Sequence, residues 1–265
     1  MQFWCSATGQ PWTWAWRAYP GAWLFAALLV VLYVAIRRRS GVHPWPAWRT
    51  LLFGLGLLAA WSAVDWPIGA LGSGYLLSLH EVQYLLLGII APALLWLSLP
   101  AEVTLGVPAA SRTGRLLRFL AAPLPALVAY TLALVLTHLP PLSDALMPTQ
   151  LGSLAIDLAW LFAGLWYWWV VVAPEGINRV RAPLRIAYLF GSTLLPTVPA
   201  AFITFAKYPL YRLYELAPPV VGWSATSDQV TAGIIMKLGA DPIIWLAMGI
   251  VFFRWSSAEG DKPPA

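Results

Sequence analysis

The sequence predicts an all-α integral membrane protein, a bundle of seven transmembrane helices with its N-terminus outside and its C-terminus in the cytoplasm. Three features predict this fold: the composition, the length of the apolar runs and the placement of arginine between them. Of the 265 residues, 60% are hydrophobic and only 10% are charged, whereas about 25% are charged in ordinary soluble domains. A soluble chain of this length could not bury so much apolar surface, so the excess must face lipid. The composition therefore excludes a soluble enzyme, a disordered chain and, with Cys5 as the sole cysteine, a disulfide scaffold.

Each predicted helix is an apolar run close to the ~20 residues that cross a bilayer. The seven runs cover residues 21–36, 50–66, 74–99, 121–139, 151–173, 183–206 and 228–253. The first run is short, and we expect Trp14, Trp16 and Tyr19 to extend it at the interface. Strands are excluded because no segment alternates, and in lipid such runs satisfy their backbone polar groups only as helices. Without a linker or internal repeat, residues 1–265 are predicted to form a single membrane domain.

Basic residues gather in alternate loops and so predict the orientation. Twelve of them follow the first, third, fifth and seventh runs, namely Arg37, Arg38, Arg39, Arg49, Arg112, Arg115, Arg118, Arg179, Arg181, Arg185, Arg254 and Lys262. The opposite loops hold only Arg17, Lys207 and Arg212. Because basic loops stay in the cytoplasm, the N-terminus is predicted outside a bacterial cytoplasmic membrane. We interpret the basic loops as signals for this topology, not as a nucleic-acid surface.

Ionisable groups inside the runs are costly, so each is a candidate for function. They are Asp65, His80, Glu81, His138, Asp157, Asp228, Lys237 and Asp241. In the predicted topology the potential metal ligands His80, His138, Asp157, Asp228 and Met236 all fall in the outer leaflet. Imidazole suits copper, zinc or iron, and a thioether favours Cu(I). These five residues therefore predict a metal site near the outer surface.

Each of these side chains also has a purely structural interpretation. His80 and His138 can be hydrogen-bonded histidines of a helix bundle, and Met236 can be ordinary packing. Asp228 can cap the start of the seventh helix, either instead of or in addition to binding a metal. Asp157 is harder to explain in this way, because its apolar helix offers no local partner.

Four strings suggest a known family. They are His80-Glu-Val-Gln83-Tyr84-Leu-Leu-Leu, Thr137-His138-Leu139-Pro140, Ala163-Gly-Leu-Trp166-Tyr-Trp-Trp169 and Asp228-Gln229-Val-Thr-Ala-Gly233-Ile-Ile-Met236. In order and spacing they resemble the CtaG-type membrane family of cytochrome c oxidase assembly factors, which is associated with caa-type oxidases. The resemblance covers residues 75–253, and the last string is its most specific part.

The resemblance implies a factor without enzymatic activity that is required to form active haem–copper oxidase. Its partner would be oxidase subunit I or an assembly intermediate, and its cargo would be copper, as Cu(I), for the copper-B centre. His80 and His138 match histidines of the family, while Asp228, Gln229 and Met236 match its final signature. Two imidazoles and a thioether suit Cu(I), with a carboxylate of Asp157 or Asp228 tuning the site.

The chain also departs from the family pattern at several positions. Tyr84, one helical turn after His80 and beside Gln83, stands where many members have a second histidine. Ser153 and Asp157 stand where many have a histidine pair, and Lys237 replaces a common tryptophan. Gln83, Tyr84 and Gln229 are therefore expected to support the site, not to ligate the metal.

Other functions compete with copper delivery. A metal-free scaffold could hold oxidase subunit I during maturation, and the missing histidines favour it. A retinal or proton-translocating protein is suggested by Lys237 in the last helix, but Asp241 one turn later explains the lysine as an ion pair. A membrane enzyme is the third alternative, but the sequence shows neither a Ser/His/Asp set nor a phosphate loop. Self-association is left open.

Overall fold

The computed structural model describes residues 2–105, 107, 110–174, 180–220 and 222–260, and every regular element within these residues is helical. In chain order the elements are α1 (Pro20–Arg39), α2 (Ala47–Val64), α3 (Ile68–Gly74), α4 (Leu77–Tyr84), the π-helical η1 (Leu85–Ile90), α5 (Ala91–Leu97), α6 (Ala101–Leu105), α7 (Arg112–Leu120), α8 (Pro123–Thr137), α9 (Pro140–Leu146), α10 (Gln150–Val172), α11 (Ala182–Leu194), α12 (Thr197–Phe205), α13 (Arg212–Glu215) and α14 (Ala225–Gly260).

Six helical stretches of the described chain are long and apolar enough to cross a membrane, which confirms the predicted all-α membrane fold. They are Pro20–Arg39, Ala47–Val64, Leu77–Leu97, Gln150–Val172, Ala182–Phe205 and Ala225–Glu259. The predicted run 121–139 corresponds to α8, which has 15 residues. α7 and α8 reach the required length only as a pair, and they are bent by 69° where they meet. The described residues thus contain six candidate spans, or seven if this bent pair counts as one.

The third span is the central one, and it is irregular. Of its most apolar stretch, 72% of residues are buried, against 17% in α1. Pro92 has no N–H to donate to the carbonyl of Gly88, and the backbone just before it is π-helical. α10 crosses at this point, where a methyl group on Gly164 would collide with that carbonyl and with the Pro92 ring. The glycine therefore permits the close approach of α10.

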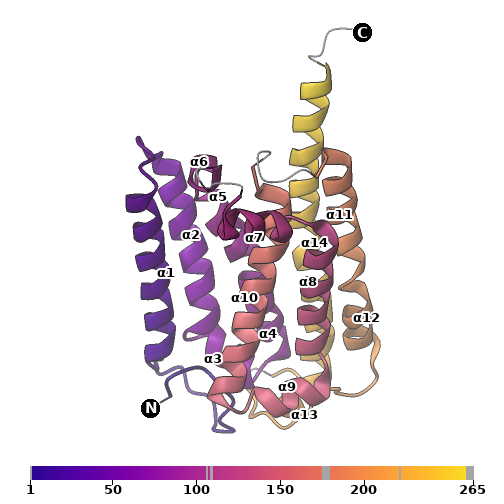
Figure 1. The fold of residues 1–265 in the computed structure, drawn as a ribbon. Helices are drawn as coiled ribbons and strands as arrows, with labels where there is room; N and C mark the ends of the chain where they lie inside the picture. The colour runs from indigo at the N-terminus through magenta and orange to yellow at the C-terminus, as the bar shows by residue number, and fades with distance from the viewer. Residues whose placement is uncertain (1, 106, 108–109, 175–179, 221, 261–265) are drawn as a thin grey trace.

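Figure 1 shows the long helices side by side, with α1 and α2 at one edge, α11 and α14 toward the other, and α4 and α10 between them. The short helices α3, α9 and α13 gather at one end of the bundle, near the first residues of the chain. We call this the N-terminal end. At the opposite end lie α6, α7 and the end of α14, so the described part of the chain begins and ends on opposite sides of the bundle.

Residues 2–19 fold back against the N-terminal end of the bundle. The backbone N–H groups of Phe3 and Trp4 donate to Gln150 Oε1 over 2.7 and 3.1 Å, and the N–H of Ala7 donates to the carbonyl of Met147. The side chains of Trp4 and Cys5 are buried. This segment is therefore part of the packed fold and closes the end of the bundle where α10 begins.

Large apolar side chains cover the outward faces of the bundle. Leu151, Phe202 and Phe205 expose 79%, 70% and 80% of their surface. Water would not stabilise such faces, whereas lipid does. The chain is a membrane protein, as its composition predicts.

Candidate functional site

His80 lies in the first turn of α4, and only 1% of its surface is exposed. The centroid of its ring lies 4.8 Å from that of Trp160, 5.8 Å from that of His138 and 6.0 Å from that of Tyr214. Neither Nδ1 nor Nε2 has a hydrogen-bond partner in the described part of the chain. A buried polar group without a partner costs roughly 1–3 kcal/mol. The ring of His80 is therefore a strong candidate to meet a ligand.

His138, at the end of α8, shares a proton with Glu81 of α4. Its Nδ1 lies 2.7 Å from the carbonyl oxygen of Leu134, and because a carbonyl only accepts, Nδ1 carries the proton. Its Nε2 lies 3.2 Å from Glu81 Oε2, so one proton lies between the two. Both residues are buried, and Glu81 Oε1 has no partner within the described residues. The sequence predicted His138 as a site residue but did not pair it with Glu81.

Aromatic side chains enclose the two histidines. Trp160 of α10 packs on both rings, and its Nε1 donates to Thr137 Oγ1 over 2.8 Å. The ring of Tyr84 lies 5.2 Å from that of His138, and its hydroxyl is 2.6 Å from that of Tyr130 on α8. These contacts fix the rings at the junction of α4, α8 and α10.

Two tyrosines at α13 cover the site from the N-terminal end. Tyr211 donates its hydroxyl to the carbonyl of His138, and Tyr214 donates to the carbonyl of Gly72, over 2.7 and 2.6 Å. Burial raises the pKa of both Tyr211 and Tyr214 above the usual range. Both hydroxyls thus remain protonated donors, and they tie α13 to the ends of α8 and α3.

Asp228 caps α4, although it belongs to α14. Its Oδ2 accepts from the N–H of Leu77 over 2.6 Å, and its Oδ1 accepts from both the N–H and the hydroxyl of Ser78. No local side chain caps α4, so the carboxylate from α14 satisfies its first N–H groups. The sequence suggested capping of the last helix as an alternative to metal binding. The structure shows capping of a different helix, three residues before His80.

The predicted supporting glutamines bind backbone. Gln83 donates from Nε2 to the carbonyl of Ala63 over 2.8 Å, while its Oε1 has no partner in the described chain. Gln229 accepts from the N–H of Leu210 and donates to the carbonyl of Tyr208 over 2.7 and 3.2 Å. Gln83 thus joins α4 to α2, and Gln229 holds the loop that leads to α13.

Asp157 finds its partner far away in the chain. Its Oδ2 accepts a hydrogen bond of 2.7 Å from Nε1 of Trp4, which lies in the N-terminal segment. Asp157 stands one turn before Trp160 on the same helix, so the N-terminal segment is anchored close to the aromatic enclosure of the histidines.

Three of the four strings on which the family resemblance rests contribute to the site, from α4, the end of α8 and the start of α14, and the third string lies further along α10. The sequence model of the cytochrome c oxidase caa3 assembly factor family (Caa3_CtaG) matches residues 27–258. The chain belongs to this family. No curated protein and no solved structure matches it significantly. The family consists of cytochrome c oxidase assembly factors, and the resemblance predicted from the sequence is confirmed.

The remaining predicted ligand of this CtaG-family chain, Met236, is completely buried in the main apolar core, on the part of α14 that packs against α4. Among the described residues, no group of three or more His, Cys, Asp or Glu side chains could hold a metal ion. The structure thus brings His80 and His138 together but engages Asp228 and Asp157 elsewhere. The metal assignment of the five residues stays a prediction.

Lys237, which replaces a common tryptophan of the family, forms an ion pair within α14. Its Nζ lies 2.9 Å from Oδ2 of Asp241, one turn later, and it also donates to the carbonyl of Thr193 over 2.7 Å. The ion pair predicted from the sequence is confirmed, and it explains the lysine without a chromophore. Ser153, another departure, is buried with a hydroxyl that has no partner in the described residues.

The third family string, in α10, serves to hold α7. Nε1 of Trp166 donates to the carbonyl of Leu120 over 3.0 Å, and Nε1 of Trp169 donates to the carbonyl of Leu117 over 2.9 Å. These carbonyls belong to the last turn of α7, where a helix runs out of backbone donors. The carbonyl of Leu117 also accepts from the backbone N–H of Ala121. This role of the two tryptophans depends on a contact between segments that lie far apart in the sequence.

Glu81 is the residue of the site whose role was not predicted from the sequence. It was identified as an ionisable side chain in a span, but its neighbour His80 received the assignment. A buried glutamate needs a partner, and His138 was the other histidine expected at the same depth. That shared depth was the available signal for the pair.

Proposed function

We propose that this CtaG-family chain assists oxidase assembly by passing Cu(I) to the copper-B centre of subunit I, from a site formed by His80 and His138. The observation that carries the proposal is the ring of His80, which is buried 5.8 Å from the ring of His138 and whose two nitrogens have no hydrogen-bond partner among the described residues. Cu(I) is a soft ion that imidazole and thioether ligands suit. Copper is the cargo of this site, since a donor must release it.

A transfer site works best with few ligands, and this one offers few. Nε2 of His138 is the nitrogen that faces Glu81, because Nδ1 is engaged by Leu134. Copper at Nε2 would displace the proton shared with Glu81, and the carboxylate would keep the site electrically balanced. Met236 would supply the third ligand after a rearrangement of the apolar core.

We further propose that the chain lies in a bacterial cytoplasmic membrane, crosses it seven times and has its N-terminal end facing outward. The bent pair α7–α8 would supply the seventh crossing. Arginines 37–39 end α1, and Arg112, Arg115 and Arg118 lie on α7, at the end of the bundle opposite the histidines. By the positive-inside rule, that end is cytoplasmic. Copper held by His80 would then lie in the outer leaflet.

A second candidate function is a metal-free scaffold that holds subunit I during maturation. One observation favours it: the described residues contain no group of three or more acidic, histidine or cysteine side chains that could hold a metal. On this reading the polar cluster around His138 fixes the helices whose outer faces grip the partner. Copurification of the chain with subunit I after copper chelation would support this function.

The two functions are separated by the metal content of the purified full-length chain after anaerobic loading with Cu(I) and desalting. We expect the wild type to retain copper and His80→Ala and His138→Ala to lose it. His43→Ala is the matched control, because His43 is an exposed histidine between α1 and α2. Near-zero copper in the wild type and all three variants would overturn the donor proposal in favour of the scaffold. The copper content of oxidase subunit I in cells that carry each variant tests the same point in assembly.

A further inference from the structure

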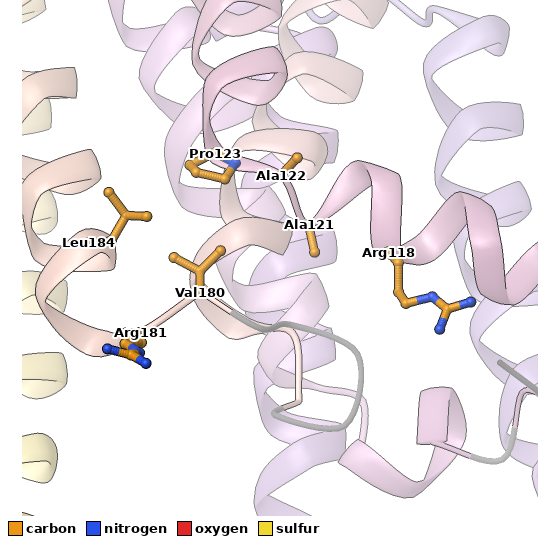
Figure 2. Close-up of a pocket in the computed structure, with 7 residues that line it drawn as sticks. All are labelled: Arg118, Ala121, Ala122, Pro123, Val180, Arg181 and Leu184. Atoms are coloured by element: carbon orange, nitrogen blue, oxygen red, sulfur yellow. The ribbon is translucent and has the colours of Figure 1, made fainter.

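A groove opens at the end of the bundle opposite the N-terminal end, between α7–α8 and the start of α11. It has a volume of about 570 Å³. Ala121, Ala122, Pro123, Val180 and Leu184 form its apolar lining, and Arg118 and Arg181 complete it. Figure 2 shows the two arginines at opposite ends of the apolar lining. The groove is thus an apolar surface with a cationic group at each end.

α7, which forms one side of the groove, has the direction and the side chains of a helix at a membrane surface. The helix turns 69° from α8, so it does not continue the direction of the bundle. It carries Arg112, Arg115 and Arg118, while Leu116 and Phe119 expose more than half of their surface. Arginine alternating with exposed leucine and phenylalanine is typical of a helix that lies in the headgroup region of a bilayer.

The walls of the groove are held in place. Trp166 and Trp169 donate to the last carbonyls of α7, which fixes the turn that carries Arg118. On the other wall, Arg185 donates from Nε to the carbonyl of Val180 over 3.0 Å, next to Arg181. The two arginines of the lining are thus presented by anchored backbone.

From this arrangement we infer that the groove binds an anionic phospholipid, with its acyl chains along the apolar lining and its phosphate on the arginine at one end of that lining, Arg118 or Arg181. A guanidinium matches the oxygen geometry of a phosphate and binds it with charge-assisted hydrogen bonds. A basic pocket between membrane helices is a recognised site for anionic headgroups. The exposed Leu184 and Phe119 beside the arginines favour a lipid over a free phosphate, which would leave this apolar surface unused. The inference does not depend on copper.

The test is native mass spectrometry of the full chain in detergent, titrated with phosphatidylglycerol, with zwitterionic phosphatidylcholine of the same acyl chains, and with glycerol 3-phosphate. We expect phosphatidylglycerol to bind at least tenfold more tightly than the other two. The double variant Arg118→Gln/Arg181→Gln should lose about tenfold or more in affinity, because one guanidinium–phosphate contact is worth about a factor of ten.

The matched control removes two arginines at the same end of the bundle. Arg38 and Arg39 are exposed at the end of α1, and Arg38→Gln/Arg39→Gln should leave the binding unchanged. Leu184→Trp fills the groove without altering charge and should weaken lipid binding, even if the arginine variant proves unstable. Equal binding of both lipids by the wild type, or equal losses in the arginine and control variants, overturns the inference. Tight binding of glycerol 3-phosphate would replace the lipid by a free phosphate ester and overturn it as well.

Discussion

Asp228 of α14 caps α4 through Leu77, whose backbone N–H lies 2.6 Å from the carboxylate. The same carboxylate accepts two further hydrogen bonds from Ser78. His80 follows in the same turn of α4, so the position of its ring depends on a residue of the last helix. The most specific string of the family, which begins at Asp228, therefore contributes to the site by positioning His80.

Asp228→Ala should destabilise the fold and loosen the first turn of α4. Loss of a helix cap costs about 0.5–2 kcal/mol, and here it also leaves the hydroxyl of Ser78 without its acceptor. Thermal unfolding in detergent should show a lower midpoint for Asp228→Ala and a smaller decrease for Asp228→Asn, which keeps one acceptor oxygen. Ser227→Ala is the control, since among the described residues Ser227 bonds only with its own loop and helix. An unchanged midpoint in Asp228→Ala would show that the cap is dispensable.

The bond between Trp4 and Asp157 should keep Cys5 hidden. The thiol is 1% exposed and donates to the carbonyl of Val64 over 3.2 Å. Burial raises the pKa of Cys5, so the thiol is protonated at neutral pH and reacts slowly, because the thiolate is the nucleophile. We expect maleimide to label the wild type slowly at pH 7 and still slowly near pH 9, where a free thiol of pKa about 8.5 is largely ionised.

Trp4→Ala should release the segment and accelerate this labelling by about tenfold or more, with Asp157→Asn producing a smaller increase. Trp14→Ala serves as the control, because Trp14 is 64% exposed. Rapid labelling of the wild type would contradict the buried position of the segment.

The spans could be predicted from sequence because length and hydropathy are local properties of the chain. The bend between α7 and α8 could not, since Ala121 and Ala122 are as apolar as the helix that follows and carry no change in hydropathy. Pro123 can begin a helix as well as interrupt one. The run 121–139 therefore gave no sign of the groove that the bend creates.

The candidate site was predicted only in part, for a physical reason. Shared depth in the membrane brought His80 and His138 together, because depth follows from position in a span. The partners of the two aspartates depend on tertiary packing: Trp4 is 153 residues from Asp157, and Leu77 is 151 residues from Asp228. A buried carboxylate without a local partner is explained equally well by a distant hydrogen-bond donor and by a metal ion, and the sequence alone does not distinguish the two.

Gly164→Leu should disrupt the contact between α10 and the central span. Any side chain there meets the backbone carbonyl of Gly88 and the ring of Pro92, and since that ring is closed onto the backbone, neither group can turn away. Overpacking costs about 1–3 kcal/mol even where side chains can move, so we expect a thermal midpoint lowered by several degrees and poor recovery from the membrane. Gly191→Leu is the matched control, because nothing lies within 4 Å of a methyl group at Gly191. Equal midpoints for the two variants would argue against the close crossing.

Removing one member of the ion pair between Lys237 and Asp241 should cost more unfolding free energy than removing both. Lys237→Met leaves the carboxylate of Asp241, whose side chain is only 9% exposed, without its cation. Breaking a fully buried pair costs about 3–5 kcal/mol, and since the lysine side chain is 28% exposed, we expect at most about 3 kcal/mol here. The double variant Lys237→Met/Asp241→Leu removes both charges and should regain most of that loss. A double-mutant cycle of unfolding free energies in detergent measures the coupling, and strictly additive effects would show that the two side chains do not act as a pair. Lys237 also donates to the carbonyl of Thr193, so Lys237→Met should loosen the contact between α11 and α14 as well. The unfolding free energy that the double variant does not regain measures this second bond.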